Sequence, residues 1–358
     1  MRDGANFSDS AYVKEGSRAF ALPTLPEGWV RKELVDGILL CRHDVNVTPD
    51  SGCVCVIGAF DGVHLGHQAL IGQACDEARI RGLISVIVTF DPDPAYVIGE
   101  GRPCTRLLES ADRLAILALQ GADAVFCLRF TPELAHTSWR TFALEVLKRH
   151  FTPVSVHVGT NFRFGAQGRG DPVSLSVLGA EQAFEVHAHE LVSCDGTVVS
   201  ATRIRRLIRN GKVSEASRLL GRYHFVRGRV VRGRGEGTSF GFPTANVEVD
   251  PLACMPAEGV YGGWVASADR AWPAAINVGA PLTFETCERP SFFEAFLIGF
   301  SGDLYGHDIA AAFVRHRRGD RRFTSMSQLK LEIAKDSEWV QKNIGTTCVE
   351  LQKEAAHR

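Results

Sequence analysis

The sequence predicts an α/β domain with a parallel sheet, followed by a mainly antiparallel β domain and a C-terminal helix. Between residues 53 and 158, apolar runs of strand length alternate with helical patterns. This alternation is typical of a parallel sheet covered by helices on both faces. After residue 222, short β-type runs alternate with turns rich in glycine and proline, which favours an antiparallel barrel or sandwich. A chain of 358 residues is long enough for two such domains.

The expected elements follow from these patterns in chain order. The strands of the first domain are CVCVIGAF, SVIVTF, ADAVFCLRF and PVSVHVG, and its helices are HQALIGQACDEARIRG, SADRLAILALQG and SWRTFALEVLKRH. Residues 200–221 predict two short helices broken at Asn210-Gly211, and residues 325–344 predict an amphipathic helix. We therefore expect a poorly patterned extension at 1–35, an α/β domain at 36–222 and a β domain at 223–348.

The composition indicates a soluble globular protein of the cytoplasm. The net charge is −1, which gives no reason to expect a nucleic-acid or membrane partner. No apolar run approaches the roughly 20 residues that cross a bilayer, and the N-terminus lacks the apolar core of a signal peptide. The ten cysteines form no Cys-x-x-Cys pair and most have apolar neighbours, so we expect buried free thiols.

The stretch GAFDGVHLGHQAL (58–70) follows an apolar strand and opens a helix. Gly58 and Gly62 let the backbone turn sharply close to a ligand, and Gly66 leaves room for a phosphate at the free N–H groups of the helix. His64 and His67 then donate hydrogen bonds to phosphate oxygens as charge develops at phosphorus. A metal site and a pair of surface histidines are the alternatives, but the strand–glycine–turn–helix setting favours phosphate.

A basic segment, SATRIRRLIRNG, contains residues that could bind phosphate groups. Ser200 and Thr202 can cap the start of a helix, and Arg203, Arg205 and Arg206 supply guanidinium groups for phosphates. A solvated basic helix is the alternative interpretation.

The string VRGRGEGTSFGFPTANV (231–247) predicts a second phosphate site. A loop of this kind can wrap a polyphosphate with its backbone amides. Its glycines are Gly233, Gly235, Gly237 and Gly241. Thr244 and Asn246 offer the oxygen ligands that Mg²⁺ prefers. A flexible hairpin without a ligand is the alternative.

Glu294 is a single acid within the apolar run FFEAFLIGF. A carboxylate there is costly unless it is paired or placed at an open site. It is either a general base for a hydroxyl or an outward-facing strand residue, and the spacing leaves both open.

The histidine motif resembles the H-x-G-H signature of nucleotidyltransferases, and six motifs together resemble one family. GAFDGVHLGH, VGTNFRFG, SATRIRRLI, GRGEGTSFGFPTANV, EGVYGGWV and GDLYGHDI stand in the order of the bacterial bifunctional riboflavin kinase/FAD synthetases. The resemblance implies an α/β nucleotidyltransferase domain with a Rossmann-like parallel sheet, then a mainly antiparallel β-barrel with a C-terminal helix. It also implies ATP-dependent phosphorylation of riboflavin to FMN and adenylylation of FMN to FAD. Riboflavin, FMN and ATP are then the small-molecule partners and Mg²⁺ the cofactor, with no nucleic acid, membrane or obligate protein partner expected.

The resemblance also implies roles for individual residues. His64 and His67 stabilise the transition state of adenylyl transfer, and Glu294 accepts the proton of the ribityl hydroxyl. The implied nucleotide site of the first domain contains Gly58, Phe60, Asp61, Gly66, Asn161, Ser200, Thr202 and Arg205. The implied ATP site of the barrel contains Gly235, Gly237, Gly241, Thr244 and Asn246, with Mg²⁺ at the last two. Tyr305 and Arg318 are the implied flavin contacts.

Some positions depart from the family pattern. Asp93 stands within Pro92-Asp93-Pro94 where Pro-His-Pro is usual, and an acid facing phosphates repels them. Ala201 replaces a usual serine, and Leu282 and Arg317 alter positions expected near the flavin. Two alternatives therefore accompany the bifunctional enzyme: a riboflavin kinase whose adenylylation is impaired by Asp93, and a non-catalytic flavin- or nucleotide-binding sensor.

Overall fold

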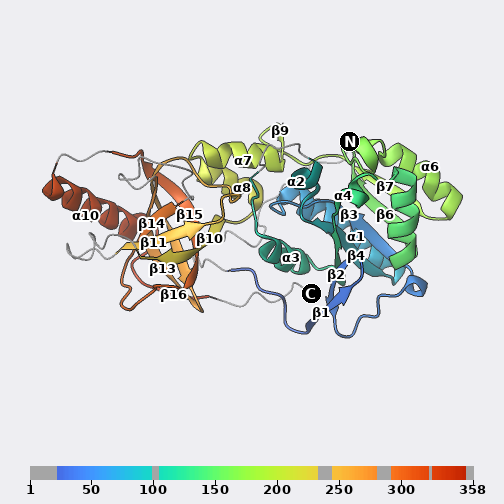
Figure 1. Cartoon of the computed structure of the whole chain (residues 1–358), viewed down its shortest axis with the longest axis horizontal. Helices are drawn as coiled ribbons and strands as arrows, with labels where there is room; N and C mark the ends of the chain where they lie inside the picture. The colour runs from blue at the N-terminus through green and yellow to red at the C-terminus, as the bar shows by residue number, and fades with distance from the viewer. Residues whose placement is uncertain (1–21, 99–104, 233–243, 280–291, 322–324, 352–358) are drawn as a thin grey trace. The chain divides into compact units, whose positions relative to one another are not determined.

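The computed structural model describes residues 22–98, 105–232, 244–279, 292–321 and 325–351 (Figure 1). The chain forms two compact units. The α/β unit is built from Pro23–Cys104 and Leu108–Ser200, and the barrel unit mainly from Ala201–Lys353 with Thr105–Leu107. The units therefore divide at Ser200, earlier in the chain than the boundary near residue 222 that the change of pattern predicts.

The α/β unit contains the parallel sheet that the sequence predicts. In the described residues, its parallel strands are β3 (Cys53–Ile57), β4 (Ile84–Asp91), β5 (Ala124–Arg129), β6 (Pro153–Gly159) and β7 (Glu185–His189). They lie in the order β5-β4-β3-β6-β7, so the chain builds outwards from β3 first on one side and then on the other. All five residues of β3 are buried, which fits a central strand covered on both faces.

A hairpin of β1 (Trp29–Leu34) and β2 (Gly37–Arg42) extends this sheet beyond β5, with both pairings antiparallel. Neither strand of this hairpin was predicted from the sequence, and β1 falls in the segment expected to be poorly patterned. Four of its six residues are exposed, so β1 is a sheet edge without the alternation that marks a half-buried strand.

Helices cover the sheet and position its loops. They are α1 (Leu65–Arg81), α2 (Pro94–Ile98), α3 (Ser110–Ala118), α4 (Pro132–Ala135), α5 (Trp139–Phe142) and α6 (Pro172–Gln182). A π-helical stretch, η2 (Ala143–Lys148), continues α5, and short 3₁₀ turns occupy Pro49–Ser51 and Ala166–Gly168. A small hairpin of β8 (Ser193–Cys194) and β9 (Thr197–Val198) precedes Ser200. Helix α1 packs against β3, β4 and β6.

The barrel unit begins with α7 (Ala201–Arg209) and α8 (Val213–Leu220). The break between them at Asn210-Gly211 is confirmed, and Gly211 has a φ of 73° that favours glycine. Its strands are β10 (His224–Val231), β11 (Thr244–Val249), β12 (Gly259–Ser267), β13 (Arg270–Val278), β14 (Phe292–Leu297), β15 (Asp308–Arg318) and the short β16 (Val349–Glu350).

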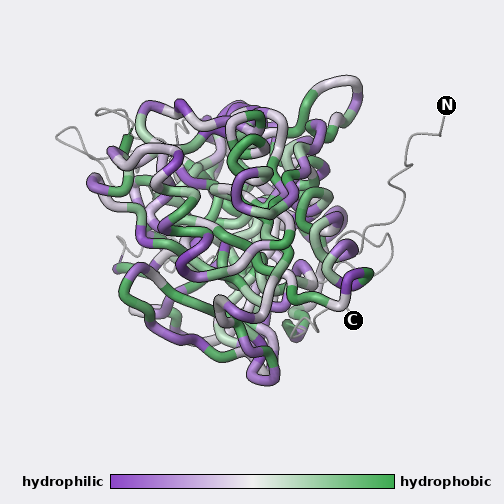
Figure 2. Tube along the Cα trace, turned by 90° about the vertical axis from the view of Figure 1, so that its right-hand side faces the viewer, coloured by the Kyte–Doolittle hydropathy of each residue, from purple (hydrophilic) through white to green (hydrophobic). Residues whose placement is uncertain are grey.

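These strands form a closed barrel. Among the described residues, the antiparallel order is β12-β15-β10-β11-β14-β13, and β12 also pairs with β13, which closes the ring. Strand β16 adds to β13 outside the ring. Closure decides between the barrel and the sandwich, which the sequence pattern had left open. Figure 2 shows green, hydrophobic stretches alternating with purple, hydrophilic ones along the trace.

The predicted C-terminal helix is α10 (Met326–Asn343). It packs on the outside of the barrel through Val340 and Trp339, beside Ala275 and Phe296. Gly262 makes this approach possible, because a Cβ there would lie 2.6 Å from the Trp339 ring. In the described part of the chain, no helix has the length and apolarity needed to span a bilayer.

The expectation of buried free thiols holds for most of the described cysteines. Cys41, Cys53, Cys55, Cys75, Cys127 and Cys254 are free and buried, whereas Cys194 is half-buried and Cys348 exposed. Burial raises the pKa of Cys75 and of Cys127 to about 11. These two thiols therefore stay protonated and unreactive at neutral pH. Cys104 and Cys287 lie outside the described residues.

His224 makes the stability of the barrel unit depend on pH. Its side chain is buried, its Nε2 lies 2.7 Å from the carbonyl oxygen of Cys254, and burial lowers its pKa to about 4. An unfolded histidine titrates near 6.5, so the unfolded chain binds the extra proton first as the pH falls. We expect stability that is full above pH ~6.5 and reduced by up to about 3 kcal/mol at pH ~4.

The measurement is urea unfolding followed by tryptophan fluorescence across this pH range. His224→Gln removes the titrating group, so its free energy of unfolding should fall less steeply with acid than that of the wild type. Equal slopes for the two proteins would contradict the prediction.

Candidate functional site

The candidate nucleotide site lies where the strand order of the α/β sheet reverses. Strands β3 and β6 are parallel neighbours, but the chain leaves them toward opposite sides of the sheet. In sheets of this kind, ligands bind in the crevice beyond the carboxyl ends of two such strands. The GAFDGVH segment follows β3, and Thr160 and Asn161 follow β6. The structure thus brings together two segments that the sequence places a hundred residues apart.

The loop after β3 has an unusual backbone that several contacts fix. Phe60 and Val63 have φ angles of 54° and 39°, which are rare for residues with side chains. The carbonyl of Ala59 accepts hydrogen bonds from Thr89 Oγ1 at 3.1 Å and from Arg113 Nη1 at 3.2 Å. Strain of this kind persists only where the surroundings determine the conformation, and it concentrates at functional sites. Asp61 is buried within this loop.

The two histidines stand together at the first turn of α1. His64 is the N-cap residue, and its Nδ1 accepts a hydrogen bond from the backbone N–H of His67 at 3.4 Å. The two rings stack with centroids 3.6 Å apart, and Phe60 packs edge-on against His67. A Cβ on Gly66 would lie 3.2 Å from the His64 ring, so only glycine leaves enough space for the imidazole in this position. Two imidazoles at a helix N-terminus suit an anion such as a phosphate.

The residues before α7 approach the same turn. A Cβ on Gly66 would also lie 3.8 Å from the carbonyl oxygen of Val199, which directly precedes Ser200. Thr202 and Arg205 follow on α7, where Ile204 and Ile208 are the buried residues. Because α7 clusters with the barrel unit, the role of Thr202 and Arg205 in holding a triphosphate stays a prediction.

Asp93 has a structural role that the sequence did not reveal. Its Oδ1 accepts a hydrogen bond from the backbone N–H of Ala95 in α2 at 2.9 Å. Its Oδ2 lies 4.0 Å from Arg113 Nη1, and both side chains are largely buried. Arg113 also contacts Asp91, at 3.4 Å, and donates to the carbonyl of Phe90. Arg113, which Asp93 shares with Asp91, therefore offsets part of the negative charge here, and this weakens the argument that Asp93 repels phosphates.

We expect Asp93→Asn to change kcat/KM for FAD formation by no more than about fivefold, equivalent to about 1 kcal/mol. Asparagine keeps an acceptor for Ala95, and Arg113 keeps Asp91 as its partner. The measurement is initial-rate kinetics with FMN and ATP. A rate increase of tenfold or more, about 1.4 kcal/mol, would mean that Asp93 repels the substrate and would overturn this interpretation.

The barrel unit presents a polar row across three strands. Glu294 on β14 pairs in register with Asn246 on β11 and with Asn277 on β13. Paired residues of antiparallel strands point to the same face, with Cβ atoms about 5 Å apart. Burial alternates along β11 and β14, with Ala245 and Ala295 inside the barrel, so the row lies on the outer face. Glu294 thus faces outward and is half-buried, and its partners make it a candidate base as well.

Thr244 lies on the outer face with Asn246, because residues two apart on a strand share a face. Their hydroxyl and amide oxygens, beside the Glu294 carboxylate, form an oxygen-rich donor set that fits Mg²⁺. Gly235, Gly237 and Gly241, predicted to wrap the ATP phosphates, lie outside the described residues, as does Leu282.

The two predicted flavin contacts lie at different places in the barrel unit. Tyr305 is exposed in the turn before β15, with the guanidinium carbon of Arg232 6.0 Å from its ring centre. Arg318 ends β15 and donates to both carboxylate oxygens of buried Asp336 on α10, at 3.3 and 2.7 Å. Arg317 lies over Trp339 of the same helix. Arg318 therefore attaches α10 to the barrel, and the contact of Arg318 with a flavin stays a prediction.

Two candidate residues were missed from the sequence. Asn277 is the polar residue of the run AAINV, and this interruption was its one signal. Arg113 lies in an expected helix, SADRLAILALQG, as a charge among apolar residues. Its side chain is almost fully buried, which is rare for arginine without partners and marks it as part of the site's support.

Comparisons with known proteins match each half of the chain to a known family. The FAD synthetase family profile matches residues 47–203, and the riboflavin kinase family profile matches residues 220–344. The bifunctional riboflavin kinase/FMN adenylyltransferase of Escherichia coli (strain K12) is 32% identical over 316 residues, which cover 88% of this chain and 99% of that protein. The enzyme of the same name from Pseudomonas fluorescens is 34% identical over 299 residues, covering 83% of this chain and 95% of that one.

A solved structure is also similar over most of the chain. A crystal structure described as a macrolide-efflux protein from Streptococcus pneumoniae superposes with a TM-score of 0.73 at 30% identity. It covers 83% of this chain and 96% of its own. The profiles, the relatives and the two units with their sites lead to one conclusion: the chain belongs to the bifunctional riboflavin kinase/FMN adenylyltransferase family.

Proposed function

We propose that this chain phosphorylates riboflavin to FMN and adenylylates FMN to FAD, using ATP in both reactions. The observation that carries the proposal is the match of one family profile to each half of the chain, each half containing its own polar site. The buried free thiols fit a reducing compartment, so we place the enzyme in the cytoplasm.

In the α/β unit, we assign the adenylyl transfer to the first turn of α1. The FMN phosphate attacks the α-phosphorus of ATP, and pyrophosphate leaves. His64 and His67 donate hydrogen bonds to the oxygens on which negative charge increases, and the adjacent backbone N–H groups add their dipoles. The fixed loop of Phe60 and Asp61 holds the turn in place, and Asn161 borders the crevice from β6. Because the histidines are positioned before the substrate binds, little reorganisation accompanies the reaction.

In the barrel unit, we assign phosphoryl transfer to the row of Asn246, Glu294 and Asn277. The terminal ribityl hydroxyl of riboflavin attacks the γ-phosphorus of ATP, and ADP leaves. Glu294 accepts the hydroxyl proton, while Asn246 and Asn277 on either side orient its carboxylate. Thr244 and Asn246 would hold Mg²⁺, which when bound neutralises phosphate charge.

The decisive assay has two starting points. Purified full-length protein is incubated with ATP and Mg²⁺, once with riboflavin and once with FMN, and the flavins are separated by chromatography. FMN followed by FAD from riboflavin, and FAD from FMN, support both assignments. FMN that accumulates without FAD from either start would leave only the kinase. Flavin that binds without turnover would leave a sensor.

A further inference from the structure

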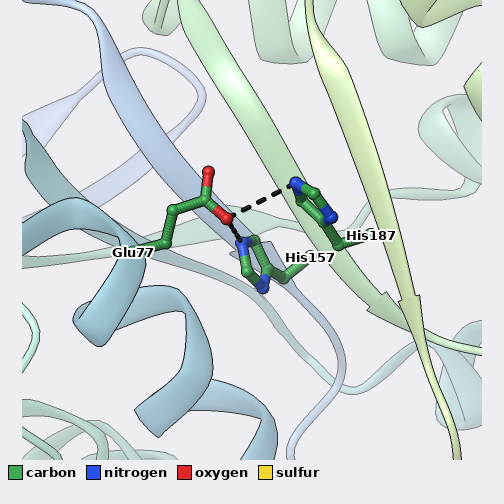
Figure 3. A group of neighbouring side chains, drawn as sticks. All are labelled: Glu77, His157 and His187. Atoms are coloured by element: carbon green, nitrogen blue, oxygen red, sulfur yellow. Dashed lines mark hydrogen bonds and ion pairs between the residues drawn. The ribbon is translucent and has the colours of Figure 1, made fainter. Parts of the chain in front are cut away.

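A second cluster of titratable groups lies away from the histidine pair of α1. Glu77 near the end of α1, His157 on β6 and His187 on β7 direct one ligand atom each toward a common point (Figure 3). Glu77 Oε2 lies 2.9 Å from His157 Nε2 and 3.4 Å from His187 Nε2. All three ligand atoms lie within 4.8 Å of one another. We call these three residues the Glu77 cluster; the proposed catalysis does not use it.

The fold sets the positions of the cluster. His157 and His187 are register partners on adjacent parallel strands, so their side chains stand side by side on the same face of the sheet. Ser155, two residues before His157, donates to Glu77 Oε1 at 2.6 Å, which shows that this is the face covered by α1. Arg81 Nε also lies 3.1 Å from Glu77 Oε1. These contacts hold one carboxylate oxygen and leave Oε2 directed at the two imidazoles.

We propose that the Glu77 cluster binds a transition-metal dication, Zn²⁺, which fastens α1 to β6 and β7. Two imidazole nitrogens and one carboxylate oxygen form a common donor set for Zn²⁺. Ligand atoms of a tetrahedral zinc site lie about 3.3 Å apart, so the separations of 2.9 and 3.4 Å need little change. Mg²⁺ prefers oxygen ligands throughout, so this site is chemically distinct from the proposed magnesium site of the barrel.

A fourth residue completes the arrangement in the way typical of metal sites. His157 Nδ1 lies 2.9 Å from His189 Nε2, and the two rings are stacked. A ligating histidine usually donates its other ring N–H to a nearby acceptor, which fixes the orientation of the ring. Here the acceptor would be a ring nitrogen of His189. With Zn²⁺ on Nε2, His157 carries its proton on Nδ1 and donates it to His189. His189 is therefore a positioning residue and not a ligand.

The site would act on the geometry of the adenylylation centre. Helix α1 begins at the catalytic pair of histidines, and β6 ends just before Asn161. A metal ion that joins α1 to β6 would hold the two elements that border the crevice at a fixed distance from each other. The side chain of His187 has a relative accessibility of 37%, but its Nε2 is buried and has no hydrogen-bond partner among the described residues. This nitrogen is therefore available to a metal ion, which would bring a water as its fourth ligand. The role of the metal ion would be structural, which goes beyond the two activities assigned above.

The test is metal binding by the full-length protein. Protein stripped of metal is titrated with Zn²⁺ against a chromogenic chelator in the presence of excess Mg²⁺. We expect one strong site, which His187→Ala and Glu77→Gln each weaken by at least about a hundredfold. His189→Gln should weaken it by about tenfold, as loss of a positioning residue does. His136→Ala is the matched control, because this exposed histidine of the same unit bonds to the carbonyl of Pro132.

Two further readouts make the result decisive. Substitution with Co²⁺ should give the intense visible bands of a four-coordinate site without a thiolate charge-transfer band, and Zn²⁺ should raise the melting temperature of wild type but not of His187→Ala. Circular dichroism of each variant checks that it is folded. Absence of a strong Zn²⁺ site in folded wild type overturns the proposal. Equal affinity in His187→Ala or Glu77→Gln also overturns it, because the metal then binds elsewhere.

Discussion

Replacement of Glu294 by glutamine should lower kcat for riboflavin phosphorylation by about 10²- to 10⁴-fold, the usual contribution of a general base. Glutamine has the same shape and keeps an oxygen for its register partners Asn246 and Asn277, but it cannot accept the hydroxyl proton. Because Thr244 and Asn246 are unchanged, KM for ATP should change little. The conversion of FMN to FAD takes place in the α/β unit and should be unaffected, which gives an internal control in the same sample.

Glu248 provides the matched control for this substitution. It lies on the outer face of β11, two residues beyond Asn246, and is exposed. Glu248→Gln removes the same charge from the same face of the barrel but leaves the Asn246–Glu294–Asn277 row intact, so both activities should be retained. If Glu294→Gln keeps its kinase activity, or if Glu248→Gln loses as much, Glu294 is an outward-facing strand residue without a catalytic role.

Local sequence pattern was sufficient for the parts of the fold whose determinants are close together. The apolar strand before GAFDGVHLGH predicts both β3 and the turn into α1, because a buried parallel strand needs a continuous apolar run and the turn needs glycine. The break at Gly211 and the helix at 326–343 follow from similarly local signals. Each of these elements is confirmed.

The parts that sequence did not predict depend on pairings between distant segments. Barrel closure rests on β12 pairing with both β13 and β15, which no run of residues shows by itself. Asn277 becomes a candidate only when the register places it opposite Glu294. Glu77, His157 and His187 are separated by long stretches, and the topology of α1, β6 and β7 alone brings them together. Asp93 has no cation near it in the sequence, and only the fold shows that Arg113 of α3 lies beside it.

Replacement of His64 by asparagine should lower kcat for FAD formation by about 10²- to 10³-fold, the usual cost of removing one preorganised donor to a developing oxyanion. His64 has two tasks in the structure: it caps α1 by accepting from the His67 N–H, and it stacks its ring on His67. Asparagine is among the best N-cap residues, so it preserves the first task while removing the imidazole. Phosphorylation of riboflavin in the other unit should continue at the wild-type rate.

Comparison with His64→Ala separates catalysis from folding. Alanine removes both the imidazole and the cap, so it should lower kcat as much as asparagine does and also destabilise the α/β unit by about 1 kcal/mol, or roughly 3 °C in melting temperature. The pair of variants therefore predicts equal loss of FAD formation with unequal stability. If instead activity follows stability, so that His64→Asn forms FAD nearly as fast as the wild type, then the contribution of His64 is to begin the helix. In that case His67 and the backbone N–H groups of α1 would stabilise the negative charge of the transferred phosphate without a contribution from His64.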